Sequence, residues 1–209
     1  CIRDRRISMD ENLKKFIDQS IKSLEFIKNH GAKEYSYDFD CSELDNQYLT
    51  VDITKSEAYK KKFDSLKEIK GPAVYWFEIT SNTNQSDLVN ALEDYSRKDN
   101  HRAVPVIKKT YCATSNYLYV GKVKKNFYSR IVQHLGYFKT AATQGLQLCH
   151  WGNNLSLKLK LHVIEFNRDM EDMMPAIEQH FAQVLKPLVG KHISVSYTHL
   201  RAHETPEHL

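Results

Sequence analysis

Apolar residues recur at three- and four-residue steps near the start of the chain. Between Asp10 and Asn29 they are Leu13, Phe16, Ile17, Ile21, Leu24 and Ile27. A stripe with this period predicts one amphipathic helix, and His30-Gly31 supplies its end. The following stretch, 34–53, alternates only weakly and indicates short strands, with Tyr48, Thr50 and Ile53 as their markers. Residues 55–70 predict a polar helix that ends at Gly71-Pro72.

The second half of the chain has a clearer pattern. Strands are expected at 73–79, which is β-branched and aromatic, at 117–123, and at 155–166, which alternates apolar and polar positions. Helices are expected after the caps Ser86 and Asn126 and from Asp172 through Leu185. These elements predict an α+β domain with a small three-stranded antiparallel sheet flanked by helices.

Composition and length are those of a soluble globular protein. The 209 residues are 41% hydrophobic and 27% charged, which is typical of one domain with at most a small appendage. No apolar run approaches the roughly 20 residues of a membrane span, so no membrane partner and a cytoplasmic location are expected. Its single, scattered cysteines are expected to be reduced thiols, and no zinc site is expected. They are Cys1, Cys41, Cys112 and Cys149.

Both ends of the sequence look unlike the middle. Met9 is a plausible true start, and 195–205 (VSYTHLRAHET) resembles the in-frame translation of a sequencing adapter. The expected organisation is therefore a mainly helical region at 1–69, a functional domain at 70–193, and an artefactual tail at 194–209.

Charge is divided unevenly between the two halves. Residues 1–100 carry a net charge of −3, whereas 101–194 carry +8. A basic half is typical of proteins that bind a polyanion, because lysines and arginines that neutralise phosphates release counterions. A solvated lysine face would give the same count.

One short constellation in the basic half carries candidate chemistry. Arg130 and His134 lie one turn apart on the helix predicted after Asn126, so both side chains point to the same side. The preceding strand places Tyr117 and Tyr119 on one face, and Gly121 lets the chain turn away without a Cβ. A phenol, a guanidinium and an imidazole are therefore expected to converge on one small area.

In the order of its motifs, the chain resembles the GIY-YIG nuclease family. The matching residues are AVY at 73–75, YVG at 119–121, Arg130 eleven residues after Tyr119, and Glu178 in a late helix. The Arg-x-x-x-His step is similar to the restriction-endonuclease branch of the family. The resemblance covers about 70–192 and implies the GIY-YIG nuclease fold, in which the predicted sheet has three strands.

This sequence departs from the family pattern in two places. The two triplets are separated by an insertion at about 80–116 where the family has a short hairpin. The insertion is a candidate DNA contact because of its basic residues, His101, Arg102, Lys108 and Lys109. The family's late asparagine, expected just after Lys186-Pro187, is Gly190 here.

Family membership would assign a role to each matched residue. Glu178 would be the ligand of one Mg²⁺ (or Mn²⁺), because hard cations take carboxylates, and Arg130 would hold the scissile phosphate. Tyr75 and Tyr119 would line the site and position the attacking water or accept its proton. His134 is a second candidate base, and Lys122 is a candidate for lowering a tyrosine pKa. The candidate substrate-binding residues are Lys122, Lys124 and Lys125.

The resulting hypothesis is a Mg²⁺-dependent DNA endonuclease, restriction-type as the first choice, that acts as a homodimer through residues 10–70. A nuclease of repair, recombination or mobile elements is compatible with the same residues. The alternatives are a nucleic-acid-binding module without catalysis and an unrelated protein with a chance motif, which would lack a basic cleft around Arg130.

Overall fold

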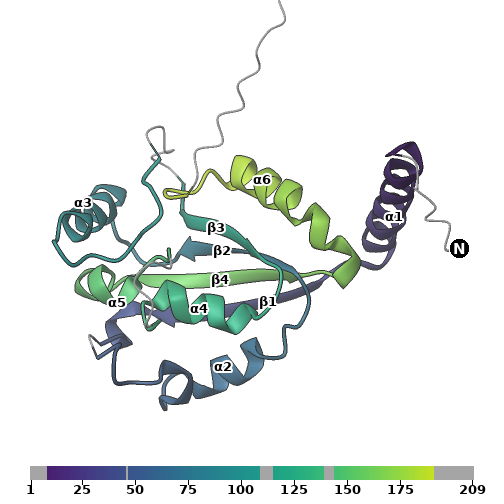
Figure 1. Cartoon of the computed structure of the whole chain (residues 1–209). Coiled ribbons are helices and arrows are strands. Elements are labelled where there is room, and N and C mark those ends of the chain that lie inside the picture. The colour runs from purple at the N-terminus through teal and green to yellow at the C-terminus, as the bar shows by residue number, and fades with distance from the viewer. Residues whose placement is uncertain (1–8, 46, 109–114, 139–143, 191–209) are drawn as a thin grey trace, which may run out of the picture.

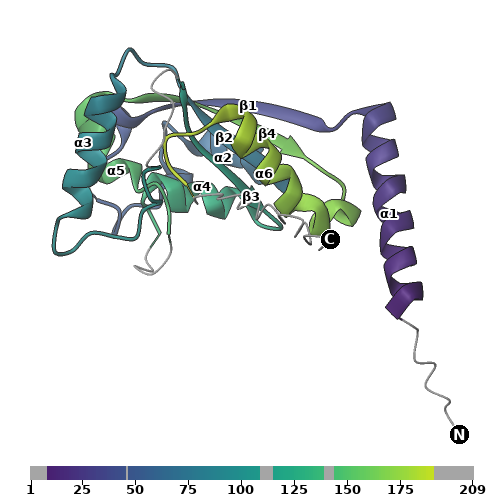
Figure 2. The ribbon, with the colours of Figure 1, turned by 90° about the horizontal axis from the view of Figure 1, so that it is seen from above.

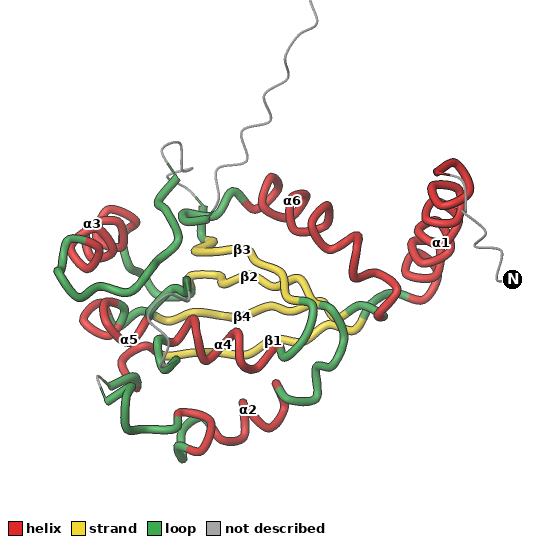
Figure 3. Tube along the Cα trace, viewed as in Figure 1, coloured by secondary structure: helices red, strands yellow, loops and turns green. Residues whose placement is uncertain are grey.

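The computed structural model describes residues 9–45, 47–108, 115–138 and 144–190 of an α+β protein (Figures 1 and 3). The helices are α1 (Met9–His30), α2 (Lys60–Leu66), α3 (Gln85–Ser96), α4 (Phe127–Leu135), α5 (Leu148–Trp151) and α6 (Met174–Leu185). The strands are β1 (Lys33–Asp40), β2 (Ala73–Ile79), β3 (Tyr117–Val123) and β4 (Lys158–Glu165). Cys1, Lys109, Cys112 and the expected tail at 194–209 lie outside the described residues.

The sheet has four antiparallel strands in the order β1-β4-β2-β3, so the prediction of three strands is wrong. The additional strand, β1, pairs along its whole length with β4, from Lys33 opposite Glu165 to Asp40 opposite Lys158. Only Phe39 of this strand is fully buried. An edge strand of this kind shows weak alternation, and the stretch around Tyr48 that indicated a strand is a turn.

Helices cover both faces of the sheet (Figure 2). Tyr75 and Phe77 of β2 point to the face covered by α4, where the ring of Tyr75 meets that of Phe127 at 5.4 Å between centroids. Trp76 points to the opposite face and stacks on Phe181 of α6 at 5.1 Å. Because side chains alternate along a strand, β2 and its neighbour β3 contribute to two separate layers.

Described residues between Phe39 and Ile69, and α3 of the insertion, pack against the same core as the sheet. Phe63 and Leu66 of α2 are fully buried in one hydrophobic cluster with Phe39 of β1 and with the α4 side of the sheet. The insertion supplies α3, whose Leu92 joins this cluster. Its Tyr95 stacks on His150 of α5 at 5.3 Å.

Several predicted helix ends are shifted. The helix expected at 55–70 is confined to α2 and preceded by a short 3₁₀ turn, and α6 begins at Met174 after a 3₁₀ segment at 168–173. Asn126 precedes α4 with φ of 57° and makes no side-chain cap hydrogen bond, so the predicted cap is absent. Helix α3 begins one residue before Ser86, the other predicted cap.

Helix α1 stands off one end of the sheet and continues through a short link into β1 (Figures 1 and 2). The Ser23 hydroxyl donates a hydrogen bond of 2.6 Å to the Asp169 carboxylate, which ties the second half of the helix to the segment before α6. Among the described helices, α1 included, none has the combination of length and apolar character that a bilayer crossing requires.

Candidate active site

Pairing between β2 and β3 sets the two tyrosines side by side. Tyr75 lies opposite Gly121, and Phe77 lies opposite Tyr119. A Cβ on Gly121 would lie 2.7 Å from the hydroxyl oxygen of Tyr75 and 2.6 Å from Cε1 of Tyr119, closer than real carbon contacts allow. Glycine is therefore required at this position so that both aromatic rings can occupy the space above β3.

Helix α4 brings Arg130 and His134 to the same phenol. The Arg130 Nε donates a hydrogen bond of 3.1 Å to the Tyr75 hydroxyl, and His134 Nε2 lies 2.8 Å from that oxygen. The stripe Phe127–Ile131–Leu135 is fully buried beneath them and fixes the rotation of the helix. The shared helix face that the four-residue spacing predicts is thus present.

The protonation of His134 follows from its second ring nitrogen. The backbone N–H of Leu146 donates a hydrogen bond of 3.2 Å to Nδ1, so in the neutral ring Nε2 carries the hydrogen and donates it to Tyr75. Burial, with the nearby Arg130 charge, holds the pKa of His134 well below its usual 6.5. The ring is fully buried, so its place is behind Tyr75, where it orients the phenol.

Stability should fall at acid pH through this ring. The unfolded chain binds a proton on His134 below about pH 6.5, whereas the folded protein does not, so the free energy of unfolding decreases as pH falls, by up to about 1.4 kcal/mol per pH unit. We expect His134→Gln to reduce this slope between pH 7 and 5 in urea unfolding. The exposed His101→Gln is the matched control and should keep the wild-type slope. An unchanged slope in His134→Gln would contradict a buried neutral ring.

The Arg130 guanidinium is held from several sides. Its NH1 group donates to the side-chain oxygen of Gln133 at 2.8 Å and to the carbonyl of Gln144 at 2.7 Å, and NH2 lies 3.5 Å from the Tyr119 hydroxyl. Burial acts to lower the pKa of Arg130, but the adjacent tyrosines hold it above its ordinary value. Sequence reasoning missed both glutamines; Gln133, three residues after Arg130 on α4, carried a detectable signal in its spacing.

Burial sets the state of the inner tyrosine. It raises the pKa of Tyr75 well above 10, the nearby Tyr119 adds to the effect, and the Arg130 charge opposes it. At neutral pH Tyr75 is therefore a neutral phenol. Its oxygen accepts hydrogen bonds from both Arg130 and His134, an arrangement that favours the phenolate once a proton has left.

Glu178 and Lys122 lie on the other face of the sheet. Lys122 is opposite Val74 and so points toward α6, where its ammonium forms an ion pair with the Glu178 carboxylate. Both side chains are partly buried. Lys124 pairs instead with Glu171 at 3.1 Å, and Lys125 is exposed on the turn. Of the three lysines predicted to bind substrate, only Lys122 is brought to the candidate site.

A cleft of about 260 Å³ lies beside β3, the edge strand of the sheet, and its lining includes residues next to both groups. Tyr119 and Gln144 line it on the α4 side, and Lys122 and Glu178 line it on the α6 side. Lys108 of the insertion is the second basic residue in the lining, and burial lowers its pKa. The other residues that line the cleft are mostly apolar: Pro105, Val106, Val120, Pro175, Gln179, Ala182, Pro187, Val189 and Gly190.

The metal expected from the family resemblance has one candidate ligand here. Within the described parts of the chain, no group of three histidine, cysteine or acidic side chains is arranged to hold a metal ion. Among the described residues that line the cleft, Glu178 is the single carboxylate. Mg²⁺ retains several waters and is often held by one or two carboxylates together with substrate phosphate oxygens, so one carboxylate fits an ion that arrives with the substrate.

No protein-family model, curated protein or solved structure matches this chain. What the cleft can do chemically therefore follows from its own side chains and from the short motifs described above.

Proposed function

We propose that the protein is a Mg²⁺-dependent DNA endonuclease that hydrolyses a phosphodiester bond by direct attack of water. One observation carries the proposal: the Tyr75 hydroxyl binds both Arg130 and His134 immediately behind Tyr119, which opens on a cleft shared with Lys122 and Glu178. These groups match the chemical needs of phosphoryl transfer, which are a phosphate clamp, a positioned water and neutralisation of developing charge.

Arg130 is the proposed phosphate clamp. A planar guanidinium suits the geometry of phosphate oxygens, and the contacts to Gln133 and Gln144 pre-orient it, so little side-chain freedom is lost when the substrate binds. Arg130 is not among the lining residues of the cleft, but it contacts Tyr119 and Gln144, which are. Lys122 and Lys108 line the cleft and would add positive charge near the backbone of a bound strand.

Tyr119 is the proposed contact to the attacking water, because it lines the cleft whereas Tyr75 is fully buried. Tyr75 and His134 support it from behind. The resting tyrosines are poor bases, so proton transfer depends on charge that the substrate complex supplies. In that complex, a Mg²⁺ ion held by Glu178 would act as a Lewis acid on the phosphate and lower the pKa of the attacking water.

A restriction-type role is the first choice among DNA nucleases, on the resemblance of the Arg-x-x-x-His step to that branch. A second function, nucleic-acid binding without catalysis, is favoured by one observation: the Lys122 ammonium already occupies the Glu178 carboxylate that the metal requires. The two functions differ in a single property, which is cleavage in the presence of Mg²⁺.

Incubation with supercoiled plasmid tests the proposal. We expect nicked and linear products with Mg²⁺ or Mn²⁺ and none with EDTA. Glu178→Ala should cleave about a hundredfold more slowly, because one metal ligand is lost, and should recover in part at higher Mg²⁺. Glu171→Ala, which removes the acid paired with Lys124 outside the cleft, is the matched control and should cleave at the wild-type rate. A folded wild-type protein that binds DNA but cleaves none would favour the binding module.

A further inference from the structure

Helix α1 exposes a continuous apolar stripe. Leu13, Ile17, Ile21 and Leu24 are each 44–55% exposed although they follow the spacing of a buried helix face. Phe16 extends the stripe at one edge and is 46% exposed. Together these side chains present roughly 400 Å² of apolar surface, which is the size of the largest patch on a typical monomer.

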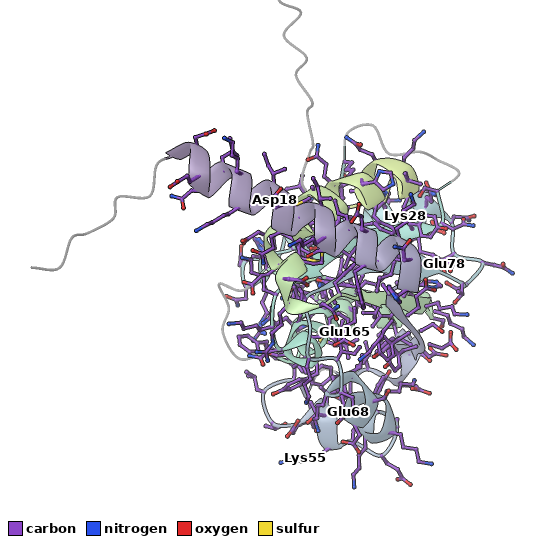
Figure 4. All side chains as sticks on the ribbon, turned by 90° about the vertical axis from the view of Figure 1, so that its right-hand side faces the viewer. Asp18, Lys28, Lys55, Glu68, Glu78 and Glu165 are labelled. Atoms are coloured by element: carbon purple, nitrogen blue, oxygen red, sulfur yellow. The ribbon has the colours of Figure 1, made fainter. Side chains whose placement is uncertain are left out.

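This stripe is not the face that α1 packs against its own protein. The contacts to the body come from Ser23, which is buried and bonds to Asp169, and from Ile27, which packs beside Met170 and Met174. At 3.6 residues per turn, these two residues lie roughly a quarter turn to one side of the stripe, so the contact to the body leaves the four stripe residues exposed. In Figure 4 the first turns of the helix, before Asp18, project beyond the rest of the molecule.

We infer that the stripe binds the same stripe of a second copy of this chain, with the two α1 helices antiparallel. The charged residues on the side of the stripe away from Ser23 decide the relative orientation of the two helices. Their signs alternate along the helix in six groups, in the order Asp10 and Glu11, Lys14 and Lys15, Asp18, Lys22, Glu25, Lys28. The series begins with an acidic group and ends with a basic one. Two antiparallel copies of the helix therefore place each acidic group opposite a basic group of the partner.

A two-fold axis perpendicular to the helices produces this reversal, because it places each edge of the stripe opposite the same edge of the partner helix. With the axis near residue 19, Lys14 lies beside Glu25 of the partner subunit, and Asp10 lies beside Lys28 of the partner subunit. A parallel pair would instead place the charged edge opposite the edge that carries Ser23 and Phe16.

The arrangement also fits the shape of the protein. Each α1 joins its body at the C-terminal end, through β1, so antiparallel helices place the two bodies at opposite ends of the pair (Figure 2). Two stripes would bury roughly 800 Å² of apolar surface, and the stems of the flanking lysines add to it. The apolar surface and the lysine stems together approach about 1,200 Å², the low end for specific interfaces. We therefore expect a dissociation constant in the micromolar range. The pairing does not depend on nuclease chemistry.

Sedimentation velocity of the full chain, from low to high micromolar concentration, tests the presence of the dimer. We expect the wild type to dimerise and Ile17→Glu/Ile21→Glu to dissociate at least about a hundredfold more readily, with unchanged helix content by circular dichroism. Val184→Glu, at an apolar position of α6 that is 62% exposed, is the matched control and should dimerise as the wild type does. A wild type that stays monomeric at every concentration would overturn the inference. The stripe would then be covered by another partner or by another part of this chain.

Two single charge reversals test the orientation. Lys14→Glu and Glu25→Lys each place like charges together twice in an antiparallel homodimer, so each alone should dimerise about tenfold more weakly. Their equimolar mixture forms a heterodimer in which both pairs are again opposite in sign, and it should regain the wild-type affinity. Effects within one helix are identical alone and in the mixture, so failure of the mixture to recover would overturn the antiparallel pairing.

Discussion

Arg130→Ala is expected to slow cleavage of plasmid DNA by about a thousandfold, which corresponds to about 4 kcal/mol of lost transition-state stabilisation. The guanidinium contacts Tyr75, Tyr119 and the Gln144 carbonyl at the rim of the cleft. Its removal leaves the negative charge on the phosphoryl oxygens without a clamp and takes one donor from the buried phenol. Single-turnover cleavage with enzyme in excess measures the effect on the chemical step.

The conservative change Arg130→Lys separates charge from geometry. Lysine keeps the positive charge but lacks the planar fork, so it should restore DNA binding without restoring more than about a tenth of the lost rate. Arg97→Ala, which breaks an exposed ion pair with Glu93 and Asp94 on α3, is the matched control and should cleave normally. Cleavage by Arg130→Ala within a few-fold of the wild type would remove this residue from the proposed chemistry.

Gly121→Ala is expected to destabilise the protein by about 2–3 kcal/mol, a large effect for one methyl group. The added carbon would meet Tyr75 and Tyr119 at 2.6–2.8 Å. The Tyr75 ring is fully buried and packed against Phe127, so it has no empty space into which to move. Urea unfolding measures the loss, and the displaced phenol should weaken its hydrogen bonds to Arg130 and His134.

A different glycine shows whether the effect comes from packing. Gly31 has φ of 75°, and an added Cβ there would meet nothing within 4 Å, so Gly31→Ala should cost only about 1 kcal/mol through backbone strain. Gly121 is not among the glycines with positive φ, so its cost is steric. Equal losses in the two variants would contradict the close approach of the two tyrosine rings to β3.

Much of the fold was readable from local patterns. The bounds predicted for β2 and β3 agree with the structure, and the buried stripe of α4 was predicted correctly, because each of these segments has a clear period of its own. Short strands were indicated within 34–53, but β1 was not placed or counted in the sheet, because it lies at an edge where a single residue, Phe39, is fully buried and the remaining positions look polar. The α+β class is confirmed, whereas the number of strands depended on this weakest segment.

The candidate site was also predicted only in part. The shared face of Arg130 and His134 was predictable, since four-residue spacing is a property of one helix. The convergence was expected at the tyrosines of the preceding strand, whereas the hydroxyl that both residues contact is that of Tyr75 on β2. The support of Arg130 by the Gln144 carbonyl and the pairing of Lys122 with Glu178 were not predicted. Each joins residues 14 or more positions apart, and the pattern around each residue contains no information about its distant partner.

The sequence by itself therefore determined the helices and the central strands, the ordered set of tyrosines, arginine and glutamate, and the amphipathic character of α1. Only the tertiary structure decided that the cleft lies beside the edge strand β3, that His134 is buried behind Tyr75, and that the stripe of α1 is left exposed by its own body. The physical reason is that hydrophobic periodicity specifies which face of a segment is buried. Which partner buries that face depends on how the whole chain packs.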